Sequence, residues 1–242
     1  MKIVISLLLL IPTAVQAFDH SGWDKILKDY TVVRGKQTLV HYEKLKGDRK
    51  KLKQYLNSLS SVKKEDYQKW SSNEKLAFLI NAYNAFTVDL ILEKYPLESI
   101  KDIGGWFSNA WDKKFFKLFG KDFYLDKIEH EIIRKKFDEP RIHFVVNCAS
   151  MSCPSLLPEA LTASELDEQL EKGAKNFLTF EKKNRYDSES KTLYLSKIFD
   201  WYGEDFAGTE KGIANYIKKY KTIGQVKDVK YLDYNWELND AI

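Results

Sequence analysis

Apolar residues recur every three to four positions along much of the chain, the spacing that places them on one face of an α-helix. The longest such segment predicts a helix over residues 71–95. Ser71, with Glu74 three residues later, has the pattern of a capping box at a helix start. Pro96 ends this helix, because proline disfavours helical backbone in the residue before it. The same spacing predicts shorter helices over residues 21–30, 52–59, 126–136, 162–180, 198–202 and 213–220.

Short runs of β-branched and aromatic residues predict strands between these helices. The apolar run 142–146 has the length of a strand, and we expect it to be central in a sheet. Hairpins are predicted where two such runs flank a polar or glycine turn, over 115–119 with 122–125 and over 186 with 193–195. Further strands are predicted over 38–42 and 229–232. The fold class that follows is α+β, with helices packed on a small, mostly antiparallel sheet.

The first residues have a different pattern, that of a secretory signal peptide over 1–17. Lys2 precedes an apolar run, and Ala17 ends a small-residue motif of the kind a signal peptidase reads. The run is about half of the roughly 20 residues that a membrane span needs. We therefore expect an exported protein, periplasmic or secreted, with no integral membrane segment after cleavage. Residues 18–242 show no repeat or linker and predict one domain, with 18–70 as a helical N-terminal cap and 71–242 as the core.

Composition narrows the function classes. The 242 residues include 39 basic and 35 acidic side chains that are interspersed, so the net charge of +4 does not predict a nucleic-acid partner. Two cysteines are too few for a disulfide scaffold or a four-thiolate zinc site. The sequence has no phosphate-binding glycine loop, GxSxG or HExxH motif. We expect no metal and no cofactor, and a peptide or small molecule as substrate.

The most unusual stretch is 141–155, which places His143, Asn147, Cys148 and Cys153 at and beyond the end of the predicted strand 142–146. Strand ends and the loops after them are favoured places for reactive groups. Small residues such as Ala149 would leave backbone N–H groups open to a developing oxyanion. A cysteine-based reaction is therefore the chemistry that this stretch favours.

Several motifs resemble the domain-of-unknown-function 547 family over about 76–239, most of the chain. They are Asn81-Ala-Tyr-Asn84-Ala, Ile128-Glu-His130 with Arg134, His143-Phe-Val-Val-Asn-Cys148-Ala-Ser with Ser152-Cys-Pro154, Trp201-Tyr with Asp205-Phe206, and the ending Leu232-Asp-Tyr-Asn-Trp236-Glu-Leu-Asn239. The resemblance implies a papain-like or transglutaminase-like core with a Cys–His site. In the family that the sequence resembles, the Ile-Glu-His element and the first cysteine recur together.

A cysteine attacks as the thiolate, so its pKa of about 8.5 must be lowered by an imidazolium or a helix N-terminus. His143 is five residues before Cys148, about 16 Å away in an extended strand. It could approach Cys153 only if the loop doubles back. His130, in the first turn of a separate predicted helix, has no such restriction, and the helix dipole keeps its imidazole neutral. With the resemblance, this favours Cys148 as the nucleophile and His130 as the base.

The group that orients His130 stays open among Asp126, one turn earlier, Glu129, and the amides of Asn81 or Asn84. Each of these residues also has a structural interpretation. Glu129 could instead complete a capping box with Asp126, and a buried asparagine could brace a loop. His143 on an apolar strand could be a core histidine. Cys148 and Cys153 could form a disulfide in an oxidising compartment.

The leading hypothesis is an exported Cys–His enzyme that hydrolyses or transfers an acyl group at an amide, thioester or isopeptide-like bond. One alternative is a thiol–disulfide redox protein that uses Cys148 and Cys153. Another is a non-enzymatic periplasmic binding module, in which the aromatic residues between Trp106 and Tyr124 form a surface for a peptide or glycan.

Overall fold

The computed structural model describes residues 17–105 and 109–242. Helices make up 48% and strands 13%, which confirms the α+β class. The strands form three separate small sheets rather than one sheet, so the single sheet predicted from the sequence is wrong. Most of the predicted signal peptide, residues 1–16, and Trp106 lie outside the described residues.

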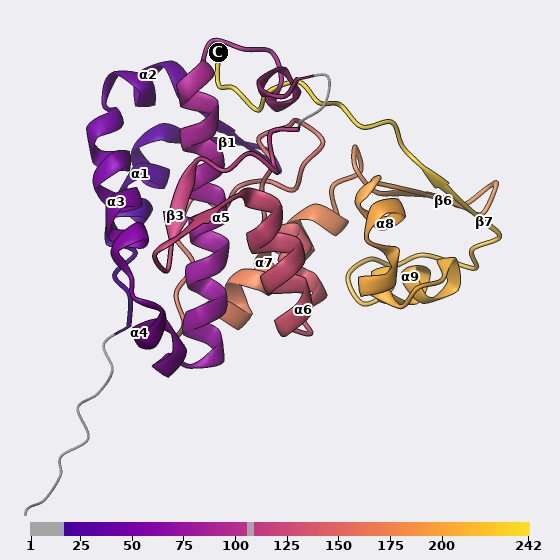
Figure 1. Cartoon of the computed structure of the whole chain (residues 1–242). Coiled ribbons are helices and arrows are strands. Elements are labelled where there is room, and N and C mark those ends of the chain that lie inside the picture. Colours follow the sequence, from indigo (N-terminus) through magenta and orange to yellow (C-terminus); the bar gives the residue numbers. More distant parts are fainter. Residues whose placement is uncertain (1–16, 106–108) are drawn as a thin grey trace, which may run out of the picture.

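The N-terminal part is a layer of helices around one long helix. Its elements are α1 Ser21–Tyr30, β1 Thr31–Arg34, β2 Gln37–Val40, α2 Tyr42–Gly47, α3 Arg49–Ser61 and α4 Lys64–Lys69. In Figure 1 the indigo and purple helices α1, α2, α3 and α4 lie along one side of α5. Apolar side chains of α1, α3 and α5 share one buried cluster, so this part packs directly on the central helix.

Helix α5, Ser72–Lys94, runs through the centre of this cluster. Its capping box is formed as predicted: Ser71 Oγ accepts from the Glu74 N–H at 3.2 Å, and Glu74 accepts from the Ser71 N–H at 2.7 Å. Every residue from Leu76 to Leu92 is buried. By length and hydropathy α5 could cross a membrane, but 94% of its apolar window is enclosed by the rest of the protein, as in a core helix.

The segment after α5 contains a short helix, a hairpin and a second helical stretch. These are η1 Ile100–Ile103, β3 Phe116–Leu118, β4 Lys121–Phe123, η2 Lys127–Ile133 and α6 Arg134–Lys136. The hairpin predicted over 115–125 is confirmed, and Phe116 and Phe123 point into the core. These two rings therefore do not belong to an exposed aromatic surface. The helix over 126–136 is also confirmed, although η2 is a π-helix, a rare form found often at functional sites.

The central strand predicted over 142–146 is wrong. Residues Pro140–Phe144 form the 3-10 helix η3, which starts with proline at its first position and with Glu139 accepting from the Arg141 N–H at 3.1 Å. Val145 and Phe144 pack against Gly173, where a Cβ atom would lie 2.6 Å from the Val145 side chain. A short apolar run buried on all sides has the same pattern as a buried strand, so periodicity alone could not separate the two.

The C-terminal part forms a second apolar cluster around a three-stranded sheet. Its elements are α7 Leu166–Leu178, β5 Arg185–Asp187, β6 Thr192–Leu195, α8 Ile198–Trp201, η4 Gly203–Phe206, α9 Glu210–Ile217 and β7 Asp228–Tyr231. Strands β5 and β6 form the predicted hairpin, whereas β7 pairs with β6 in parallel.

After β7 the chain returns to the N-terminal part, as the yellow trace in Figure 1 shows. On the way it pairs with the loop after η3: the Met151 N–H donates to Glu237 O at 2.8 Å, and the Ser152 N–H donates to Asn235 O at 3.1 Å. Further on, Tyr42 Oη donates to Asn239 Oδ1 at 2.8 Å. The returning segment 232–240 therefore connects the two cores beside both cysteines.

Candidate active site

The loop that carries both cysteines is held by asparagine side chains. Asn84 on α5 accepts from the Asn147 N–H and donates to Val145 O, both at 2.9 Å. Asn147 accepts from the Ala149 N–H at 2.9 Å and donates to Pro154 O at 2.7 Å. Ala149 has a φ of 63°, a left-handed conformation that non-glycine residues seldom adopt. These contacts fix the backbone on both sides of Cys148.

Asn81, one turn before Asn84, contacts a different loop. Its amide accepts from the Leu161 N–H at 3.0 Å and donates to Leu161 O at 2.8 Å. Asn81 and Asn84 are both buried and bonded to backbone, which is the loop-bracing arrangement. The structure does not bring either amide to His130: each amide's hydrogen bonds in the described chain go to loop backbone.

The Cys148 thiol is partly exposed and lies among hydroxyl groups. Its sulfur is 3.3 Å from Ser150 Oγ and 3.3 Å from Tyr234 Oη. A hydrogen bond with the Cys153 side chain is the largest cause that lowers its pKa, to about 7, and those of Ser150 and Tyr234 add to it against the opposing effect of burial. At neutral pH a large fraction of Cys148 is therefore thiolate, the nucleophilic form.

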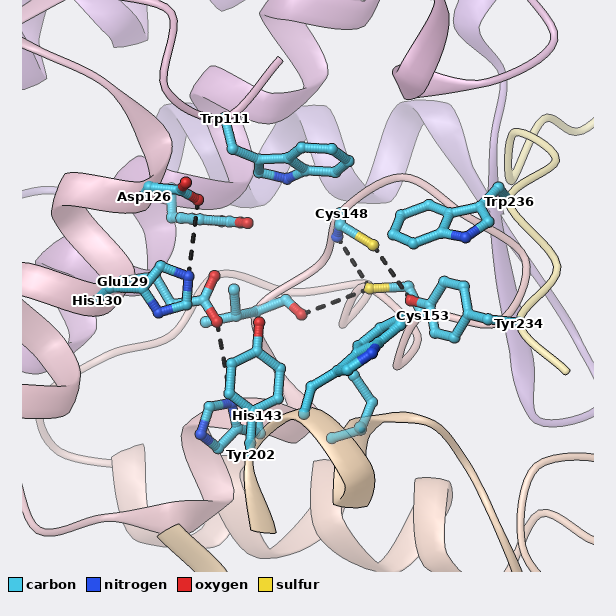
Figure 2. A pocket seen from close by; sticks show the side chains of 14 residues that line it. Trp111, Asp126, Glu129, His130, His143, Cys148, Cys153, Tyr202, Tyr234 and Trp236 are labelled. Carbon is cyan, nitrogen blue, oxygen red and sulfur yellow. Dashed lines mark hydrogen bonds and ion pairs between the residues drawn. The ribbon is translucent and has the colours of Figure 1, made fainter. Parts of the chain in front are cut away.

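Cys153 lies directly beside Cys148 but is buried. Its sulfur accepts from the Cys148 N–H at 2.9 Å, and both cysteines are free thiols (Figure 2). Burial is the main cause that raises the pKa of Cys153 well above its usual range. The two thiols thus have opposite properties: Cys148 is acidic and faces a pocket, while Cys153 stays protonated behind it.

A buried lysine lies behind this cysteine pair. Lys183 is 7% exposed, and its Nζ donates to the carbonyl oxygen of Cys153. Burial lowers its pKa to about 8, and the attraction of Cys153 and Cys148 only partly opposes that shift. The lysine anchors the far end of the cysteine loop with a positive charge.

Two of the backbone amides expected to form an oxyanion hole are already occupied. The Cys148 N–H donates to Cys153 Sγ and the Ala149 N–H donates to Asn147 Oδ1, both at 2.9 Å. For these two amides the side chains of Cys153 and Asn147 fold back onto the N–H groups. The sulfur of Cys148 is hydrogen-bonded instead by the backbone N–H of Ser150 and by the hydroxyls of Ser150 and Tyr234.

A pocket of about 280 Å³ opens in front of Cys148. The described residues that line it are mostly aromatic or ionisable: Tyr83, Trp111, Asp126, Glu129, His130, His143, Val146, Cys148, Cys153, Ile198, Trp201, Tyr202, Tyr234 and Trp236. Figure 2 shows Asp126, Glu129 and His130 on one side and Cys148, Tyr234 and Trp236 on the other. The pocket therefore has an acidic end on η2 and a thiol end against the returning segment.

His130 shares the pocket with Cys148 but is bonded to its own helix. Its Nδ1 is 3.1 Å from Arg134 Nη1, and its Nε2 is 3.7 Å from Asp126 Oδ1. Arginine can only donate, so Nδ1 accepts and the neutral ring carries its hydrogen on Nε2, toward Asp126. Burial is the main cause that raises the pKa of Asp126. No hydrogen bond among the described residues joins the imidazole of His130 or of His143 to Cys148 Sγ, so His130 as the base stays a prediction.

His143 is a core histidine that also belongs to an ion-pair network. Its side chain is 1% exposed and its Nε2 donates to Asp205 Oδ2 at 2.6 Å. Arg134 donates to both oxygens of the same carboxylate, at 2.6 and 2.9 Å. Burial raises the pKa of Asp205, but the hydrogen bonds from His143 and Arg134 outweigh it and bring the pKa below its usual range. The His143 ring stacks on Tyr202 at 4.2 Å.

Glu129 is not the capping partner of Asp126, because Asp126 makes no side-chain bond to the start of η2. The Glu129 side chain is 7% exposed and lines the pocket. Its nearest ion-pair contact is His143 Nδ1 at 3.9 Å, which is beyond hydrogen-bond distance. Within the described ranges, no group of three or more His, Cys, Asp or Glu side chains is placed to hold a metal ion.

The sequence assigned no role to several residues of the site, above all Tyr234, Tyr202 and Asp205, or to the hydroxyl of Ser150. The residues at 201–206 and 232–239 were noted only as motifs of a family resemblance. Tyr234 lies 86 positions from Cys148, so no local pattern could join them. The one available signal was the recurrence of tryptophan, tyrosine and aspartate in those two segments.

Comparison with known families supports part of the sequence interpretation. The model of a family described as "Protein of unknown function, DUF547" matches residues 67–178. The matched segment includes α5, η2 and the cysteine loop, so the resemblance to this family is supported there. No curated protein and no solved structure matched the chain. The relation to papain-like and transglutaminase-like enzymes stays a prediction.

Proposed function

We propose that this protein is a cysteine-dependent acyl-transfer enzyme, a hydrolase or transferase, with Cys148 as its nucleophile. The observation that carries the proposal is an acidic thiol, with a pKa lowered to about 7, at the wall of an aromatic pocket. Perturbed pKa values in clefts are typical of functional groups. A buried structural cysteine would show the opposite shift, as Cys153 does.

In the proposed reaction the Cys148 thiolate attacks the carbonyl carbon of an amide or thioester. The C–S bond forms, the bond to the leaving group breaks, and the leaving group takes a proton from the Asp126–His130 pair. Water, or another acceptor, then attacks the thioester and returns a proton to the pair, which releases the thiolate. Support for this role of the pair is its place at the pocket end opposite the thiol (Figure 2).

The negative charge that develops on the carbonyl oxygen needs a hydrogen-bond donor. We assign that role to the hydroxyl of Tyr234, which is 3.3 Å from the sulfur and accepts from Ser150 Oγ at 3.1 Å. Burial is the main cause that raises the pKa of Tyr234 well above its usual range, so its hydroxyl keeps its hydrogen at neutral pH. A pocket of about 280 Å³ suits a small substrate or one side chain of a peptide.

The proposal is tested by measuring iodoacetamide labelling rates across pH for the wild type, Cys148→Ala and Cys153→Ala. We expect fast labelling with an apparent pKa near 7 in the wild type and in Cys153→Ala, and loss of this phase in Cys148→Ala. Mass spectrometry with activated acyl esters should then find one acyl group on Cys148. Unchanged labelling of Cys148→Ala would overturn the proposal.

A second candidate is thiol–disulfide exchange, favoured by the direct contact of Cys148 with Cys153. Here Cys148 attacks a substrate disulfide, Cys153 then displaces the mixed disulfide, and two substrate thiols are released as Cys148–Cys153 forms. A reduction potential within the range of redox enzymes, about −120 to −270 mV, would support this candidate. In either case we propose that the protein is exported, on the evidence of the predicted signal peptide.

A further inference from the structure

The acidic end of the pocket contains a buried carboxylate without a cationic hydrogen-bond partner among the described residues. Glu129 lies on η2, its side chain is 7% exposed, and it opens onto the pocket. Burial, the charge of Glu129 and a hydrogen bond to Glu129 raise the pKa of Tyr202, so the neutral Tyr202 hydroxyl is directed at this carboxylate, and His143 Nδ1 is 3.9 Å away. Buried charges are normally paired and hydrogen-bonded, because an unpaired one costs several kcal/mol or more. Tyr202 supplies a neutral donor here, and a cationic donor could still be bound by this end of the pocket.

The neighbours of Glu129 include a second carboxylate in the pocket and one arginine, Arg134, that attracts Glu129 without lining the pocket. Asp126 lies on the same side of the pocket, and Asp205 takes the Nε2 hydrogen of His143 at 2.6 Å. Arg134 donates hydrogen bonds to both oxygens of Asp205, and these donors are therefore not directed at Glu129. Among the described lining residues there is neither lysine nor arginine. An anionic ligand would be repelled here, whereas a cation would be attracted.

The remaining walls are aromatic rings, which also favour a cation. Trp111 packs edge-on to Trp236 at 5.8 Å, and Tyr234 lies 4.5 Å from Trp236. Trp201 is 45% exposed and lies 4.8 Å from Tyr234. Trp236 already binds one cation of this chain, because Lys101 Nζ lies 4.1 Å from the centre of its ring. Faces of tryptophan and tyrosine attract ammonium groups through their quadrupole.

From these observations we infer that the acidic end of the pocket is a binding subsite for an ammonium group, with Glu129 as its principal ligand. A primary ammonium has three N–H donors, which can satisfy Glu129 and reach Asp126 at the same time. A neutral hydroxyl would only repeat the contact that Tyr202 already makes and would bring no positive charge to Glu129. As a statement about substrates, this rests on the proposed function: the acyl compound that reaches Cys148, or its acceptor, carries a protonated amine.

The test measures binding without turnover, in the full chain with Cys148→Ala. n-Butylammonium and its uncharged counterpart n-butanol are titrated, with the fluorescence of the pocket tryptophans and calorimetry as readouts. We expect n-butylammonium to bind at least about tenfold more tightly than n-butanol, the value of one charge-assisted contact. Equal affinities, or no binding of n-butylammonium, would overturn the inference, and this comparison requires no change at Glu129.

Variants then locate the charge. Glu129→Gln keeps the shape of the side chain and should remove the preference for the cation. Glu131→Gln is the matched control, because Glu131 is an exposed glutamate of the same helix that bonds Tyr124 outside the pocket. A preference that persists in Glu129→Gln contradicts the assignment. If Glu129→Gln does not fold, Asp126→Asn should weaken n-butylammonium binding severalfold, and an unchanged affinity contradicts the subsite.

Failure of the subsite and failure of the proposed enzyme are distinguishable. Iodoacetamide labelling of Cys148 in the wild type reports on the thiol alone. An acidic, reactive Cys148 with no preference for n-butylammonium would leave the acyl-transfer proposal standing and remove the ammonium subsite. A tight n-butylammonium site beside an unreactive Cys148 would support the ammonium subsite and remove the acyl-transfer proposal. The protein would then be a binding module for amines.

Discussion

The hydroxyl of Tyr234 lies 3.3 Å from the sulfur of Cys148, although 86 positions separate the two residues. The contact forms because the returning segment after β7 pairs with the cysteine loop through Met151 and Ser152. Burial raises the pKa of Tyr234, which keeps its hydrogen available to the sulfur. Tyr234 in the returning segment thus changes the chemistry of Cys148 in the loop after η3.

We predict that Tyr234→Phe raises the pKa of Cys148 and slows its alkylation at pH 7 severalfold. The reason is the loss of one hydrogen-bond donor to the thiolate, which is a charge-assisted contact of about 1.5–3 kcal/mol at most. The measurement is the iodoacetamide rate as a function of pH. Tyr186→Phe serves as control, since Tyr186 bonds the backbone of Gln225 at 2.9 Å away from the pocket. The same pH profile in both variants would contradict the assignment.

The two asparagines of α5 give a matched pair of variants. Asn84→Ala and Asn81→Ala each leave one buried N–H and one buried C=O group unpaired. Both should lower the free energy of unfolding by roughly 2–4 kcal/mol, measured by urea denaturation. Only Asn84→Ala should also change the labelling rate of Cys148, because only Asn84 holds Asn147. Equal effects on labelling would mean that Asn84 does not position the cysteine loop.

Asp205 should make stability depend on pH in the acid range. Its pKa is lower in the folded protein than the value of about 3.9 in the unfolded chain, through His143 and Arg134. The contribution is therefore complete above the unfolded pKa and is lost as pH falls through the folded pKa. Asp205→Asn should be less stable at pH 7 by about 2 kcal/mol. Its unfolding free energy should also fall less steeply below pH 4 than that of the wild type, and parallel curves would contradict this role.

Lys183 should make stability rise with pH in the alkaline range. Burial lowers its pKa to about 8 in the folded protein. The unfolded chain, with a lysine pKa of about 10.4, then binds more protons between these values, so stability rises with pH there. The wild type should gain up to about 3 kcal/mol relative to Lys183→Met from pH 8 to 10.4. The difference in unfolding free energy between the two proteins cancels the titration of the tyrosines, which both contain. A difference that stays constant with pH would show that Lys183 does not titrate in this range.

The sequence predicted the elements whose signals are local. The capping box at Ser71 and Glu74 needs only four residues, and the hairpins at 116–123 and 185–195 need only a turn between two apolar runs. The run 142–146 was misread because its burial comes from α7, in particular from Gly173, and not from sheet neighbours. Neither propensity nor spacing reports which distant element covers an apolar run.

For the site, the sequence identified reactive residues better than their partners. Cys148, His130, Asp126 and Glu129 all line the pocket. The amide of Ala149 is not free, because the side chain of Asn147 turns back onto it. The hydroxyl of Tyr234 comes from a distant segment, and the bond between His130 and Arg134 depends on side-chain geometry. Such contacts become visible only when the whole chain is folded.

The returning segment also governs when the thiol becomes reactive. Until residues around Tyr234 dock on the cysteine loop, Cys148 lacks that donor and its pKa stays closer to the ordinary value of about 8.5. In a partly folded chain the Cys148 thiol is therefore less reactive and less prone to oxidation or unspecific alkylation. Completion of the fold therefore completes the activation of the thiol. Local detachment of the segment 232–240 would raise the pKa of Cys148 and slow its reaction, while the contact with Cys153 would remain.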